Sequence, residues 1–102
     1  MGQYVKVAKL EEIPAGQSKF VEVEGKSVAL FNVGGTLYAI ENDCNHAGGP
    51  LAEGTLEGDQ VECPWHGARF DVKTGKALTP PASGALATYP ARVQGSDVEI
   101  EV

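Results

Sequence analysis

Apolar and polar residues alternate with a period of two at both ends of this 102-residue chain. This alternation is typical of β-strands that bury one face. The alternating apolar residues are Val5, Val7, Val21, Val23, Val98, Ile100 and Val102. Residues 86–93 are expected to form the partner strand of the last segment, across a turn at residues 95–97.

Two further segments, Ser27–Val33 and Thr36–Ile40, are almost continuously apolar and are separated by Gly34-Gly35, which predicts a tight hairpin. No segment has the periodicity of a helix, although residues 8–12 could form one turn before Pro14. The chain also holds 13 glycines and 6 prolines. We therefore predict an all-β fold with short strands.

The central part of the chain, residues 41 to about 84, is interrupted much more often by glycine and proline. Short strands are expected around residues 60–63 and 68–72. This change of composition predicts a small subdomain inserted into a larger β frame. With 102 residues the chain is long enough for one modest core, so we expect residues 1–102 to form a single domain.

All the cysteines and histidines lie in two short segments, Cys44-Asn45-His46 and Cys63-Pro64-Trp65-His66. Each segment offers one thiol and one imidazole, and both are ligands of transition metals. A disulfide would leave both histidines without a role, and a cysteine–histidine catalytic pair would leave one residue of each type over. The pattern therefore predicts a metal site between two loops.

Two kinds of metal site fit these four residues. Structural zinc accepts mixed cysteine and histidine ligands, but it commonly uses paired cysteines followed by paired histidines. A two-iron, two-sulfide cluster needs four protein ligands, and in one variant two histidines replace two cysteines on one iron. The ligand chemistry favours the iron–sulfur cluster and leaves zinc open.

Cys44-x-His46 and Cys63-Pro64-x-His66-Gly67 resemble the two-part ligand motif of Rieske proteins. The resemblance extends to Pro50-Leu51, Arg69-Phe70-Asp71, Thr74-Gly75 and Pro80-Pro81, and thus covers nearly the whole chain. It implies an antiparallel β-sandwich frame with an inserted cluster-binding subdomain, at about residues 41–84. It also implies one 2Fe–2S cluster, with Cys44 and Cys63 on the buried iron and His46 and His66 on the outer iron.

The chain departs from the respiratory Rieske proteins at positions that affect the cluster. Gly49 and Trp65 stand where the resemblance would place two disulfide-forming cysteines, and Ala68 and Phe70 stand where it would place a Ser and a Tyr. Fewer hydroxyl donors to sulfur penalise the reduced cluster. We therefore expect a reduction potential of roughly −150 mV rather than +300 mV.

The composition indicates an electron carrier rather than an enzyme. No third histidine is available for the mononuclear iron of an oxygenase, and no G-x-G-x-x-G turn indicates a reductase. The chain resembles soluble ferredoxins that pass electrons from an NAD(P)H-dependent flavin reductase to a terminal ring-hydroxylating oxygenase. Two alternatives are the small subunit of assimilatory nitrite reductase and, in another class, a zinc-stabilised interaction module.

The net charge of −6 disfavours nucleic acid and anionic membranes as partners. No apolar run approaches the roughly 20 residues of a membrane span, and no signal peptide is evident, so we expect a cytoplasmic monomer. Six acidic residues and no basic residue lie between Lys26 and Arg69, which predicts an acidic cluster-binding region. Arg69 and Asp71 are expected to face water.

Overall fold

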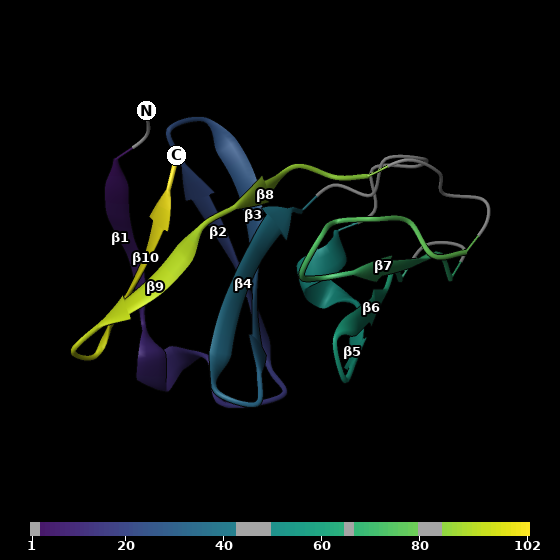
Figure 1. Ribbon diagram of the computed structural model, residues 1–102, viewed down its shortest axis with the longest axis horizontal. Coiled ribbons are helices and arrows are strands. Elements are labelled where there is room, and N and C mark those ends of the chain that lie inside the picture. Colours follow the sequence, from purple (N-terminus) through teal and green to yellow (C-terminus); the bar gives the residue numbers. More distant parts are fainter. Residues whose placement is uncertain (1–2, 43–49, 65–66, 80–84) are drawn as a thin grey trace.

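The computed structural model describes residues 3–42, 50–64, 67–79 and 85–102 and arranges their strands in three antiparallel sheets (Figure 1). The first sheet has the order β1 (Tyr4–Lys9), β10 (Asp97–Glu101), β9 (Ala91–Gln94). The second has the order β2 (Ser18–Val23), β3 (Lys26–Val33), β4 (Thr36–Glu41), β8 (Thr88–Tyr89). The third, called the small sheet below, has the order β5 (Thr55–Glu57), β6 (Gln60–Glu62), β7 (Arg69–Asp71).

Helical structure in the described residues is limited to two single turns of 3-10 helix, η1 (Leu10–Glu12) and η2 (Leu51–Glu53). The predicted all-β fold is therefore confirmed, including the single turn before Pro14. None of the described helices is long and apolar enough to cross a membrane.

The second sheet is the middle layer of the molecule and packs apolar side chains on both faces. One face joins the first sheet in a sandwich core, made of Ala8, Ile13, Val21, Val23, Val28, Leu30, Leu37, Ala39, Val98 and Ile100. The opposite face joins the small sheet in a small-sheet core, made of Ala29, Phe31, Ile40, Leu51, Val61, Cys63, Ala68, Phe70, Val72 and Leu86. Successive residues of β3 point to alternate faces, so a strand buried on both must be apolar throughout.

The β3–β4 hairpin has the predicted two-residue turn. Val33 pairs with Thr36, and Gly34 and Gly35 have φ values of +59° and +99°. A backbone with positive φ at both central positions matches the right-handed twist of the flanking strands and favours glycine. The hairpin is thus specified locally as well as by its apolar residues.

The predicted strand at residues 86–93 is wrong as a single element. Pro90 divides it, because proline has no N–H to donate to a ladder. Before this residue, β8 pairs with β4, and after it, β9 pairs with β10. The last part of the chain therefore connects the middle sheet to the first sheet.

The expected alternation at the N-terminus is also interrupted. The register of β1 against β10 shifts between Lys6 and Ala8. A bulge of this kind inserts one extra residue and changes which side chains face the core. Ala8 is buried as a result, whereas Val5 and Val7 are only half-buried.

We predict that replacing Phe31 by alanine destabilises the protein by about 3–5 kcal/mol, because it empties a fully buried site between the middle and small sheets. Phe20→Ala is the matched control, since that ring is 48% exposed, and it should cost about 1 kcal/mol or less. Urea unfolding of both variants measures the difference. Equal midpoints would contradict the importance of the second buried face.

Candidate metal centre

The structure describes one of the four predicted ligands. Cys63 directly follows β6, is only 1% exposed and belongs to the small-sheet core. Cys44, His46 and His66 lie outside the described residues, as do Gly48, Gly49, Trp65, Pro80 and Pro81. Within the described ranges, no three Cys, His, Asp or Glu residues gather where they could hold a metal ion.

Cys63 lies at the connecting end of the β6–β7 hairpin, directly after β6. Val61 pairs with Phe70 and Glu62 with Arg69, and the backbone N–H of Cys63 donates to the carbonyl of Ala68 at 2.7 Å. Gly67, just before this pair, has a φ of +70°, which glycine adopts at little cost. The hairpin therefore places a buried cysteine at the start of the second motif and returns the chain to β7.

The described residues that share the small-sheet core with Cys63 are apolar. Ala68 and Phe70 stand where the resemblance places the hydroxyl donors of respiratory Rieske proteins, and both are fully buried in the same core. A buried thiolate is costly in such surroundings unless a metal or another cation compensates its charge. A buried thiol, by contrast, simply packs as a small apolar side chain. The packing is compatible with both the thiol and the metal-bound thiolate, so it does not by itself identify Cys63 as a metal ligand.

Described residues near residues 43–49 and 80–84 belong to the small-sheet core or bond to the small sheet. Leu51, shortly after residues 43–49, and Leu86, shortly after residues 80–84, are both in the small-sheet core. Thr79, just before residues 80–84, accepts a hydrogen bond through Oγ1 from the backbone N–H of Arg69 at 2.9 Å. Residues close to both segments are thus anchored on the small sheet or in the small-sheet core.

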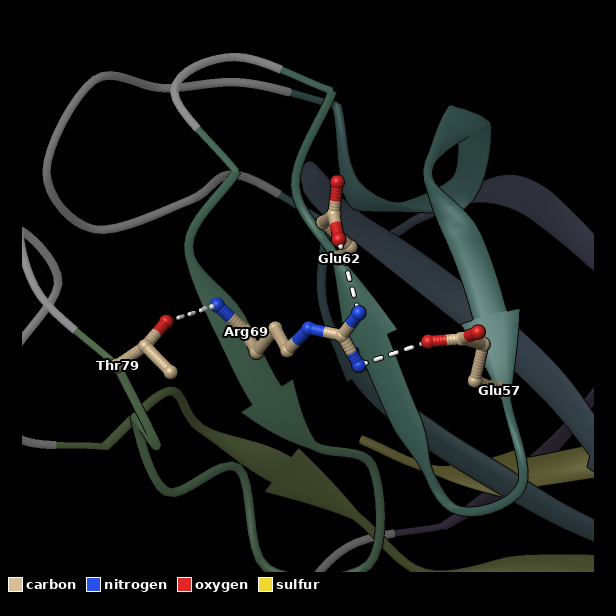
Figure 2. A network of polar contacts seen from close by, with 4 residues as sticks. All are labelled: Glu57, Glu62, Arg69 and Thr79. Carbon is tan, nitrogen blue, oxygen red and sulfur yellow. Dashed lines mark hydrogen bonds and ion pairs between the residues drawn. The ribbon is translucent and has the colours of Figure 1, made fainter.

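Arg69 joins all three strands of the small sheet (Figure 2). Its Nη1 lies 2.8 Å from Oε1 of Glu57 on β5, and its Nη2 lies 3.1 Å from Oε1 of Glu62 on β6. The hydrogen bond and the negative charge of Glu57 raise the pKa of Arg69 above its ordinary value. The expectation that Arg69 simply faces water is wrong, because hairpin register places two carboxylates within its reach.

This network changes the expected charge of the region. Two of the six acidic residues between Lys26 and Arg69 share the charge of Arg69, and a third, Asp59, lies 3.7 Å from Nζ of Lys73. The residues that follow position 68 therefore compensate part of the acidity that the preceding stretch carries. The region is less negative than the stretch between Lys26 and Arg69 indicates by itself.

Known proteins with similar sequences are ferredoxins. The chain is 42% identical, over 100 residues, to the ferredoxin component of the naphthalene 1,2-dioxygenase system of Pseudomonas aeruginosa. The aligned region covers 98% of this chain and 96% of the relative. It is also 47% identical, over 92 residues, to the 3-phenylpropionate/cinnamic acid dioxygenase ferredoxin subunit of Shigella boydii, covering 89% of this chain and 86% of the relative.

The fold is shared with solved structures. A chain in the complex of reduced oxygenase and oxidized ferredoxin of carbazole 1,9a-dioxygenase matches with a TM-score of 0.90 and 33% identity, over 96% of this chain and 92% of that one. These relatives are electron-carrying components of dioxygenase systems and are not the catalytic enzymes.

The model of the Rieske [2Fe-2S] domain matches residues 3–90, a range that includes both cysteine–histidine segments. This match supports an iron–sulfur protein with one 2Fe–2S cluster and not the alternative of a zinc-stabilised module. The antiparallel sheets, the buried Cys63 and the paired motifs agree with this match. This chain belongs to the Rieske [2Fe-2S] domain family.

Proposed function

We propose that this chain is the ferredoxin component of a bacterial aromatic-ring dioxygenase system. It takes single electrons from an NAD(P)H-dependent flavin reductase and delivers them to a terminal ring-hydroxylating oxygenase. The observation that carries the proposal is the 42% identity to a naphthalene dioxygenase ferredoxin over almost the full length of both chains. The carbazole dioxygenase complex supports the oxygenase as a partner, because a chain of the same fold occurs there with its oxygenase.

We assign the cluster ligands to Cys44, His46, Cys63 and His66. Two thiolates and two imidazoles form the donor set that a Rieske cluster requires. The burial of Cys63 in the small-sheet core supports its place on the inner iron, with Cys44 as the second thiolate. His46 and His66 would hold the outer iron, and the two imidazoles would form the side of the cluster that exchanges electrons with a partner.

The cluster, when bound, accepts and releases one electron at a time. The chain surrounds the Cys63 side with apolar residues of the small-sheet core and so excludes water from it. Arg69 holds a permanent positive charge on the same sheet, as a guanidinium does at any ordinary pH, and Glu57 and Glu62 hold this group in place. With the cluster bound, the ring nitrogen of each imidazole that does not bind iron would carry a proton that oxidised iron makes easier to release, which would couple electron and proton uptake at high pH.

The remaining features of the proposal concern the state of the protein in the cell. Residues 1–102 form one domain that works as a cytoplasmic monomer. A net charge of −6 suits basic protein partners and disfavours nucleic acid. The partners are therefore the reductase and the oxygenase, each met in turn.

The first test is the cofactor itself. We expect the purified protein to be red-brown, to contain two irons per chain and to bleach with dithionite. His66→Ala should abolish the reversible one-electron couple, because the outer iron loses one of its two protein ligands. A colourless protein with one zinc, or an intact couple in the variant, would contradict the ligand assignment.

Introducing hydroxyl groups near Cys63 should raise the reduction potential. Ala68→Ser and Phe70→Tyr each place a donor in the small-sheet core, and a new hydrogen bond to sulfur should shift the potential upward on the order of tens of mV. Ala77→Ser and Phe31→Tyr introduce the same groups at other positions of this core or beside it. Protein-film voltammetry should find the controls unchanged, and equal shifts in all four variants would refute a specific effect on the cluster.

Removing the charge of Arg69 should lower the potential. In Arg69→Gln, Glu57 and Glu62 lose their common cation, and uncompensated negative charge should disfavour reduction on the order of tens of mV at low salt. Arg92→Gln is the matched control, because Arg92 binds Glu99 at 2.7 Å across the β9–β10 hairpin. The two variants are compared by voltammetry at low and high ionic strength. A potential that is unchanged in both would exclude Arg69 as an electrostatic influence on the cluster.

A further inference from the structure

Asn42 is one of two buried polar residues in the described part of the chain, and it lies two positions before Cys44. It directly follows β4 and is only 5% exposed. A buried amide is costly unless it is hydrogen-bonded, so its bonds indicate why it is there.

Asn42 joins two segments that lie on either side of the first ligand motif. Its backbone N–H donates to the carbonyl of Ser27, at 3.0 Å, which extends the β3–β4 pairing. Its backbone carbonyl accepts from the N–H of Leu51 at 2.8 Å, and its side-chain Oδ1 accepts from the N–H of Ala52 at 2.9 Å. The backbone and side chain of Asn42 therefore fasten the end of β4 to the first residues of η2, and Cys44 and His46 lie between these two points in the sequence.

The far end of this closure is itself fixed. Leu51 is fully buried in the small-sheet core, and the hydroxyl of Ser18 on β2 donates to the carbonyl of Ala52 at 2.7 Å. The turn η2 is thus held by β2, by Asn42 and by the core that also contains Cys63. Loss of the Asn42 side chain would remove its hydrogen bond to Ala52 and would leave its backbone bond to Leu51 in place.

We propose that Asn42 is a positioning residue of the cluster. By holding η2 against the end of β4, it fixes the distance between the two ends of the segment that carries Cys44 and His46, and the position of these ends relative to Cys63. The proposal rests on the ligand assignment above. Hydrogen bonds to metal ligands orient them, and their loss commonly weakens metal binding 10- to 100-fold. Asn42 acts on the backbone at the two ends of the segment that carries two ligands, so we expect an effect at the lower end of this range.

The chain offers a close control in Asn32, the other buried polar residue. Asn32 is 4% exposed, its Nδ2 donates to the carbonyl of Ile13 at 2.7 Å, and its Oδ1 accepts from the N–H of Gly35 at 2.8 Å. These bonds fix the loop at residues 13–17 and the β3–β4 turn, and both are distant in sequence from the ligand motifs. Asn32→Ala should therefore lose comparable stability without affecting the cluster.

The experiment compares Asn42→Ala and Asn32→Ala in the cluster-containing protein. We measure the thermal midpoint, the rate of iron release to a chelator, the visible circular dichroism and the electron paramagnetic resonance spectrum of the reduced cluster. Asn42→Ala should release iron about tenfold faster and should change both spectra. Asn32→Ala should lower the thermal midpoint but keep the spectra and the release rate of the wild type.

A conservative replacement tests the acceptor oxygen directly. Asn42→Asp keeps an oxygen that can accept from Ala52, so its iron release should be slower than that of Asn42→Ala. Ser18→Ala removes the second restraint on Ala52 and should accelerate release in the same direction, which keeps the proposal testable if Asn42→Ala does not fold.

Three results would overturn the positioning role. These are equal iron release in Asn42→Ala and Asn32→Ala, release from Asn42→Asp as fast as from Asn42→Ala, and no acceleration in Ser18→Ala. A wild-type protein without iron is a different result, because it refutes the ligand assignment and not only the role of Asn42.

Discussion

Burial of the middle sheet on both faces is the constraint on which the rest of this structure depends. Strands β3 and β4 contribute to both cores: Val28, Leu30, Leu37 and Ala39 to the sandwich core, and Ala29, Phe31 and Ile40 to the small-sheet core. The small sheet therefore cannot separate from the frame without exposing Phe31. Apolar burial at roughly 25 cal/mol per Å² is the main favourable term available to so short a chain. The cluster-binding part is therefore held in place by the same strands that stabilise the sandwich.

Polar contacts then refine what the apolar layers hold. Arg69 connects β5, β6 and β7, and its backbone amide also reaches Thr79 (Figure 2). Asn42 similarly connects the end of β4 to Leu51 and Ala52 of η2. The first network is half-exposed and contributes little to stability by itself, whereas the second is buried and loses more when one partner is removed. Both act on segments that adjoin the ligand motifs.

The sequence was sufficient for the elements whose signal is local. The β3–β4 hairpin follows from two apolar runs and Gly34-Gly35. The paired motifs likewise predict a ligand set, which stays a prediction because the structure describes only Cys63 of its four residues. Pro90 was a visible interruption of the predicted last strand, and it could have divided residues 86–93 in advance. The bulge in β1 and the partners of Arg69 have no local signal, because both depend on the register between strands. The same is true of Asn42, whose side-chain bond reaches Ala52, 10 positions further along the chain.

The low reduction potential expected for this chain rests on two contributions of unequal weight. Hydrogen bonds to sulfur act at contact distance, and the absence of hydroxyl groups at the buried positions Ala68 and Phe70 therefore dominates. The charges of the acidic residues act over longer distances and are screened by salt. Arg69 and Lys73 compensate three of these charges in part. However, Arg69 carries one positive charge against the two carboxylates it contacts, so this group of three remains negative overall. Compensation weakens the electrostatic contribution without reversing its sign, and both contributions still disfavour the reduced cluster.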